Sequence, residues 1–183
     1  MNVALYFGSF NPMHTGHLAI CRYLAGCNIL DEVRLVVSPA NPLKSKLNGI
    51  NSQERLEHVR NVVSKLRESQ GNNLNITVSD IEFTLPEPLY TIETMRTFTR
   101  MEPENRFILV IGADNLAIIE KWHRWQDLLD EYEIWVYPRK GYDLKGLCAK
   151  YDTIPIEASM VDISSSEIRD GEANGLEMSD FKV

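Results

Sequence analysis

Two histidines, His14 and His17, stand three residues apart directly after a segment of turn-forming residues, Gly8 to Pro12. Residues at this spacing share one face of a helix, so both imidazoles can reach the same ligand. A loop with outward-pointing backbone N–H groups, followed by the positive end of a helix dipole, favours phosphate without needing a lysine. Imidazoles beside such a loop can donate hydrogen bonds to oxygens that gain charge as a phosphorus–oxygen bond breaks. The pattern therefore predicts a phosphate site with a catalytic purpose.

Alternative roles for this segment stay open. It lacks the Gly-Lys-Ser/Thr of a Walker loop and the three-glycine spacing of a dinucleotide fingerprint. The histidines could be metal ligands, which would require a third ligand, or buried residues whose hydrogen bonds the backbone satisfies. We favour contacts with phosphate.

Apolar runs alternate with segments of helical periodicity along the whole chain. Short apolar runs that predict strands occupy residues 3–7, 33–39, 75–83, 107–111, 133–138 and 154–156. Apolar residues at helical spacing occupy 18–25, 55–69, 91–101, 116–129 and 144–151. Run 107–111 is the most hydrophobic and belongs in the middle of the sheet, whereas 75–83 alternates with polar residues and belongs near an edge. This order predicts an α/β protein with a doubly wound parallel sheet and helices on both faces, a three-layer α/β/α arrangement.

Three unusual segments, 8–17, 112–114 and 138–141, each follow a predicted strand. Parallel sheets of this kind bind ligands at the carboxyl ends of their strands. We therefore expect the three segments to meet at one rim of the sheet.

Composition limits the class of protein. The 183 residues fit one domain, and the net charge of −7 argues against a protein that binds nucleic acid. Cys21, Cys27 and Cys148 lack the paired spacing of a zinc site and suit reduced thiols. The chain opens directly on the first strand and has no apolar run long enough for a membrane span. We expect a cytoplasmic protein.

Two segments far apart in the sequence resemble known signatures. Residues Gly8 to His17 are similar to the first signature of the nucleotidylyltransferase superfamily, of the Rossmann-like HxGH type, and Ile163 to Arg169 resemble its second. Within it, the closer resemblance is to the nicotinate-nucleotide adenylyltransferase family of bacteria. The segments that carry this closer resemblance are 38–44, 90–95, 111–116, 122–125 and 138–141. The resemblance assigns residues 1–170 to the nucleotidylyltransferase domain and leaves 171–183 as a short, divergent or truncated tail with no predicted element.

The resemblance implies an enzyme of NAD biosynthesis. It would transfer the adenylyl group of ATP to nicotinate mononucleotide and form deamido-NAD and pyrophosphate, without a covalent intermediate. Mg²⁺ is implied as a cofactor held by ATP phosphates and water, with no protein metal ligands. The implied partners are the two substrates, with no nucleic acid and no membrane, and the formation of a homo-oligomer stays open.

The same resemblance assigns the site residue by residue. The ATP-binding residues would be Gly8, Ser9, Phe10, His14, His17, Gly112, Asp114, Ser164, Ser165 and Arg169. The mononucleotide-binding residues would be Asn41, Lys44, Thr91, Trp122, His123 and Arg139. The catalytic residues would be His14, His17, Lys44 and Arg169.

Several of these residues also fit simpler structural roles. Lys44 could be a solvated loop charge, Trp122 a core residue of an amphipathic helix, and Asp114 or Ser165 a helix cap. Leu43 departs from the family, which has a histidine before this lysine. Alternative functions are adenylyl transfer to nicotinamide mononucleotide or phosphopantetheine, or nucleotide binding by a non-catalytic regulator on the same fold.

Overall fold

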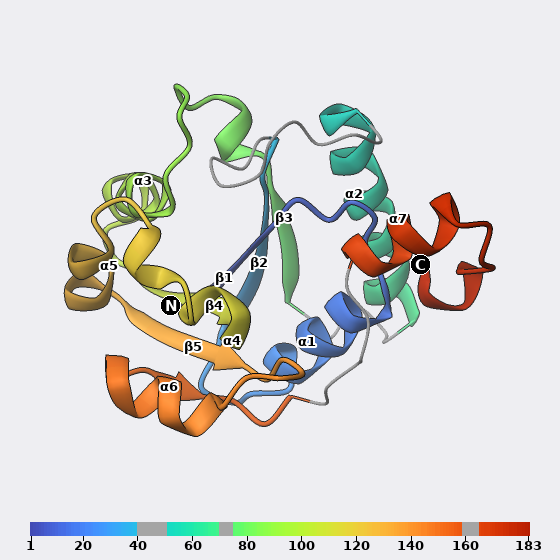
Figure 1. Ribbon diagram of the computed structural model, residues 1–183. Helices are drawn as coiled ribbons and strands as arrows, with labels where there is room; N and C mark the ends of the chain where they lie inside the picture. The colour runs from blue at the N-terminus through green and yellow to red at the C-terminus, as the bar shows by residue number, and fades with distance from the viewer. Residues whose placement is uncertain (40–50, 70–74, 159–164) are drawn as a thin grey trace.

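The computed structural model describes residues 1–39, 51–69, 75–158 and 165–183. The predicted site residues Asn41, Lys44 and Ser164 lie outside these ranges, and so does Leu43. Within them the chain forms a six-stranded, all-parallel sheet with the strand order β3-β2-β1-β4-β5-β6 (Figure 1). The strands are β1 (Asn2–Gly8), β2 (Glu32–Val37), β3 (Ile76–Ser79), β4 (Arg106–Gly112), β5 (Glu133–Tyr137) and β6 (Ile154–Pro155).

The strand order reverses between β1 and β4, which are the two central strands. Every residue of β4 except Arg106 is buried, and this explains why the segment is continuously apolar. β3 lies at the edge of the sheet, as its alternating pattern predicted. The strand expected over 75–83 is shorter than predicted, because β3 ends at Ser79 and a 3-10 turn, η1 (Ile81–Phe83), follows.

Helices cover both faces of the sheet, which confirms the three-layer prediction. In Figure 1, α1 (Thr15–Ala25) and α2 (Ser52–Ser69) lie on one side, and α3 (Thr91–Met101) and α5 (Trp125–Glu131) lie on the other with α6 (Leu144–Tyr151). Successive β2 residues enter different cores: Leu35 and Val37 pack with α1 and α2, whereas Val36 packs with α3 and α5. Among the described residues, no helix is long and apolar enough to cross a membrane.

The prediction of a single helix over 116–129 is wrong. The segment divides into α4 (Ala113–Leu116), a 3-10 turn η2 (Ile119–Lys121) and α5. Arg124 adopts left-handed backbone angles, with φ 51°, and a left-handed residue cannot continue a helix. Trp122, just after η2, has an extended backbone conformation, so it does not lie on a helix face.

The end of the chain also differs from expectation, since 171–183 carry structure. Helix α7 (Ser165–Ala173) continues through Gly171, and a 3-10 turn, η3 (Ser179–Phe181), follows. Met178 packs so closely on Gly171 that a Cβ there would lie 2.8 Å from its sulfur. Lys182 then forms an isolated antiparallel bridge with His14. The tail thus returns to the first signature.

Candidate active site

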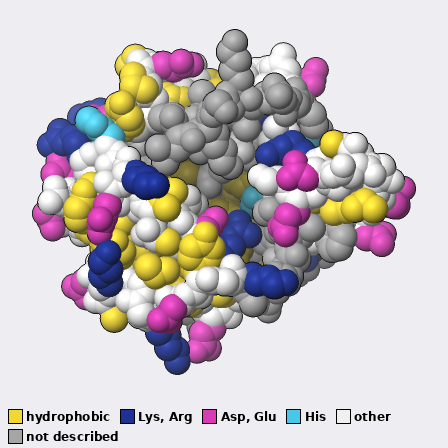
Figure 2. Space-filling model, viewed as in Figure 1, with side chains coloured by type: hydrophobic (Ala, Val, Ile, Leu, Met, Phe, Trp, Pro, Cys, Tyr) yellow, Lys and Arg dark blue, Asp and Glu magenta, His cyan; other side chains and the backbone are white. Residues whose placement is uncertain are grey.

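A cavity of about 520 Å³ opens at the carboxyl ends of the strands, above the point where the strand order reverses. Figure 2 shows this face hollowed near its centre, with hydrophobic side chains visible inside and Lys and Arg side chains around it. The cavity brings together most of the predicted residues that the structure describes. Those that line it are Gly8, Ser9, Phe10, His14, His17, Thr91, Asp114, Trp122, His123, Arg139 and Ser165. Gly112 and Arg169 are not among the residues that line it.

The two histidines form the N-terminal cap of α1. Nδ1 of His14, the N-cap residue, accepts a hydrogen bond from the backbone N–H of Gly16 (3.1 Å). Nδ1 of His17 accepts one from the backbone N–H of His14 (3.2 Å). A neutral imidazole whose Nδ1 accepts must carry its proton on Nε2. Each ring therefore presents an N–H donor at Nε2 and has no lone pair there for a metal.

Burial keeps both rings neutral. It lowers the pKa of His14 to about 4, with a further contribution from the nearby charge of Arg139. Burial, followed by the proximity of His14 and Arg139, lowers the pKa of His17 well below its usual value. The ring centroids lie 3.7 Å apart, and Nε2 of His14 is buried without a partner among the described residues. A buried donor without a partner is costly, so the pair is prepared for a ligand with acceptor oxygens.

Arg55, on α2, holds the loop that follows β1, although it was not among the predicted site residues. The side chain is only 2% exposed, and its guanidinium donates to the carbonyl oxygens of Ser9, Ser38 (3.1 Å) and Pro39 (3.0 Å). It thus joins the loop after β1 to the loop after β2. The sequence contained a signal that Arg55 is buried. It precedes Val59 by four residues and so lies on the buried face of its helix.

The second signature contacts the same loop further along the chain, at Asn11 and Pro12. The Ser165 hydroxyl donates to the Pro12 carbonyl oxygen (2.9 Å), and the Arg169 guanidinium donates to the Asn11 carbonyl oxygen. Arg169 also donates to the Ser166 hydroxyl (3.1 Å). The structure therefore gives both residues a contact with the first signature, 153 or more positions away in sequence. Their predicted contact with ATP phosphates stays a prediction.

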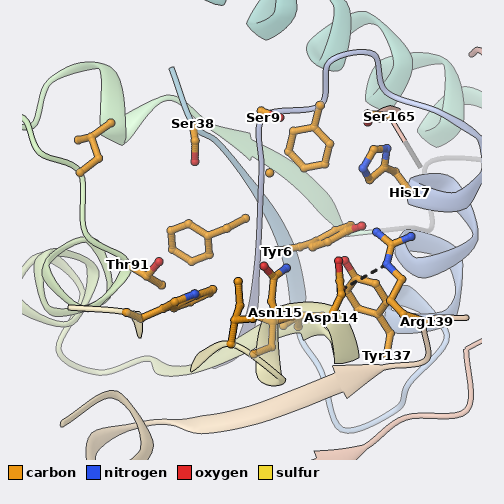
Figure 3. A pocket seen from close by; sticks show the side chains of 18 of the residues that line it. Tyr6, Ser9, His17, Ser38, Thr91, Asp114, Asn115, Tyr137, Arg139 and Ser165 are labelled. Carbon is orange, nitrogen blue, oxygen red and sulfur yellow. Dashed lines mark ion pairs between the residues drawn. The ribbon is translucent and has the colours of Figure 1, made fainter. Parts of the chain in front are cut away.

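Arg139 lies beside the histidines. Figure 3 shows its guanidinium next to His17, and Nε lies 3.5 Å from Oδ1 of Asp114. The guanidinium also lies over the ring of Tyr137, 5.2 Å from its centroid. Gly112 permits this arrangement, because a Cβ there would lie 2.3 Å from Oδ1 of Asp114. Arg139 thus belongs to the histidine half of the cavity, and the predicted contact with the mononucleotide stays a prediction.

The other half of the cavity contains Thr91, Trp122 and His123. Thr91 begins α3, and Trp122 packs against the core while also lining the cavity, with Nε1 buried and unpaired among the described residues. His123 stacks on Tyr90, with 4.1 Å between ring centroids. Figure 3 shows Thr91 and Ser38 well away from His17 and Arg139, so the cavity has two halves.

Fold and site together define an α/β nucleotidyltransferase type of protein, with the first signature at the strand switch point and the second against its loop. The cytidylyltransferase-like family model matches residues 5–171, and the chain belongs to that family.

Comparison with relatives and with a solved structure shows which proteins the chain is similar to in sequence and in fold. A Flavobacterium johnsoniae protein named "Probable nicotinate-nucleotide adenylyltransferase" is 37% identical over 96% of this chain and 88% of its own. One of the same name from Porphyromonas gingivalis is 36% identical over 92% and 83%. The Plasmodium falciparum nicotinic acid mononucleotide adenylyltransferase complexed with NaAD has the same fold, with TM-score 0.76 at 19% identity over 98% of this chain and 87% of its own. The resemblance to nicotinate-nucleotide adenylyltransferases is confirmed.

Proposed function

We propose that this chain transfers the adenylyl group of ATP to nicotinate mononucleotide, forming deamido-NAD and releasing pyrophosphate. The observation that carries the proposal is the pair of neutral histidines, His14 and His17, whose Nε2–H donors stand together on one half of a two-part cavity. The names of the relatives support the same reaction.

The reaction needs alignment and charge stabilisation. The phosphate of the mononucleotide attacks the α-phosphorus of ATP, and the bond from that phosphorus to the oxygen bridging to the β-phosphorus breaks, so that pyrophosphate leaves with the electron pair. No proton has to be removed from the nucleophile. The protein aligns the attack in line and stabilises the leaving group. His14, His17 and Arg139 provide donors and positive charge where the leaving pyrophosphate gains charge.

We propose that Mg²⁺ accompanies ATP. The histidine half presents mostly hydrogen-bond donors, and Asp114 faces Arg139, so this half suits phosphate oxygens better than a bare cation. The ion would be held by the phosphates and water and would neutralise phosphate charge.

We further propose that the chain acts in the cytoplasm. Cys21, Cys27 and Cys148 are free thiols, and free thiols suit a reducing compartment.

The direct test is pyrophosphate release by the purified protein with ATP, Mg²⁺ and nicotinate mononucleotide. We expect turnover with this acceptor and at least roughly tenfold lower kcat/KM with nicotinamide mononucleotide, because the acid and amide differ in charge and in hydrogen-bond donors. Equal rates with both, turnover only with phosphopantetheine, or no turnover at all would contradict the proposal.

Trp122 offers a second test. If its indole stacks on the pyridinium ring, Trp122→Leu should raise the KM for the mononucleotide about tenfold, since such cation–π contacts contribute about 0.5–2 kcal/mol. The KM for ATP should change less than twofold. Trp135→Leu is the matched control, because that indole is buried in the sheet, where Glu133 accepts a hydrogen bond from it. A Trp122→Leu variant with an unchanged mononucleotide KM would contradict stacking.

A further inference from the structure

Glu82 is a buried carboxylate in the half of the cavity that contains Thr91. It lies in η1, only 4% exposed, and it lines the cavity beside Ser38. Oε1 accepts a hydrogen bond from the Thr94 hydroxyl (2.9 Å), which fixes the side chain. Oε2 is buried and has no hydrogen-bond partner among the described residues. Since a buried carboxylate oxygen without a donor is costly, a donor from a ligand would complete it.

Within the described part of the chain, the charge of Glu82 also has no compensating cation. Among the described residues, no lysine, arginine or histidine forms an ion pair with it. Burial raises the pKa of Glu82, and the hydroxyls of Ser38 and Thr94 oppose that rise only in part. An acidic group is unexpected on a surface that receives an anionic substrate, unless that substrate offers it a hydrogen-bond donor.

The chemistry of the acceptor substrate indicates which of its groups donates to Oε2 of Glu82. This step rests on the proposed function. At neutral pH nicotinate mononucleotide has a carboxylate and a phosphate, which only accept, and a pyridinium whose nitrogen carries the ribose instead of a hydrogen. Its ribose hydroxyls at 2′ and 3′ are therefore its hydrogen-bond donors. We propose that Oε2 of Glu82 accepts a hydrogen bond from a ribose hydroxyl of the mononucleotide and so determines how the acceptor is oriented.

The charge of Glu82 also orients the substrate. The carboxylate attracts the pyridinium charge and repels the nicotinate carboxylate and the phosphate, so a mononucleotide bound the wrong way round is disfavoured. The Thr94 hydroxyl, in turn, keeps Oε1 occupied and leaves Oε2 for the ligand. Thr94 is thus a positioning residue for Glu82.

The test combines Glu82→Gln with 2′-deoxy and 3′-deoxy nicotinate mononucleotide. Glutamine keeps an oxygen for Thr94 but replaces Oε2 by an amide nitrogen, which cannot accept. We expect kcat/KM for nicotinate mononucleotide to fall about 10- to 100-fold, as for loss of a hydrogen bond to a charged group. Most of the change should be in the mononucleotide KM, with the KM for ATP within twofold. Glu87→Gln is the matched control, because Glu87 is exposed in the same segment and the charge change is equal.

The deoxy analogues distinguish contact from a structural role. The wild-type protein should lose a similar factor with one analogue, and Glu82→Gln should lose little more with that same analogue. A Glu82→Gln variant that matches wild type, or that weakens all three acceptors by the same factor, would overturn the inference. A wild-type protein that does not use nicotinate mononucleotide would overturn the proposed function and this inference with it. Thermal unfolding of each variant confirms that the folded protein is compared.

Discussion

Replacing His17 by glutamine is expected to lower kcat by about 10²- to 10³-fold, the cost typical of losing one preorganised donor to a developing anion. Glutamine at this third helical position can still accept from the backbone N–H of His14 and so preserve the capping box. Its amide N–H sits on a flexible chain and is not fixed in the position of Nε2 as the rigid imidazole N–H is. The variant should therefore keep its thermal stability while losing turnover.

Steady-state kinetics measure kcat of the His17→Gln variant, and equilibrium binding measures its affinity for the mononucleotide. We expect mononucleotide binding to change much less than kcat, because the proposed contact is made to the ATP phosphates as the bond breaks. His58→Gln is the matched control, since His58 lies on α2 and does not line the cavity. Loss of mononucleotide binding, with normal turnover of whatever complex forms, would instead assign His17 to the acceptor.

Arg34→Met is expected to destabilise the fold by about 3 kcal/mol, because removing one partner of a buried ion pair leaves the other charge uncompensated. Arg34 donates to Glu32 through Nε (2.8 Å) and Nη2 (3.0 Å), and to Glu102 through Nη1 (2.6 Å). The Arg34 and Glu32 side chains are 14% and 8% exposed. Without the guanidinium, Glu32 would retain the Thr77 hydroxyl (2.6 Å) as its donor among these groups.

The loss of stability in Arg34→Met is expected to become smaller as the pH falls. Burial alone would raise the pKa of Glu32, but the hydrogen bonds from Arg34 and Thr77 outweigh it, and the pKa lies below its usual value of 4.5. A carboxyl whose folded pKa is lowered stabilises the fold above its unfolded pKa and loses that contribution as pH falls through the folded pKa. The Arg34→Met deficit should thus be complete at pH 7 and smaller below about pH 4.

Urea unfolding at pH 7 and at acidic pH measures both effects. Arg106→Met is the matched control, because the Arg106 side chain is 57% exposed in its pair with Glu133. Exposed pairs contribute about 0–1 kcal/mol, so this variant should remain near wild type. Equal stability losses for the two variants would show that the Arg34 cluster behaves as a surface pair.

Local patterns in the sequence predicted the layers of the fold and the histidine half of the cavity. The alternation of apolar runs with helical periodicity predicted the parallel sheet, the central position of β4 and the edge position of β3. His14 and His17 were recognisable because a turn-forming loop and a helix start are local features. Such features can be predicted because backbone conformation and burial periodicity are set over a few residues.

The contacts between groups far apart in the sequence could not be predicted in this way. The helix expected around Trp122 is broken, the tail returns to His14, and Arg55 joins two loops. Glu82 was indistinguishable in sequence from a solvated glutamate, and only packing against Thr94 made it a buried cavity residue. These contacts join segments that the chain order does not relate, so they depend on how the packed layers close around the cavity and not on any local pattern of residues.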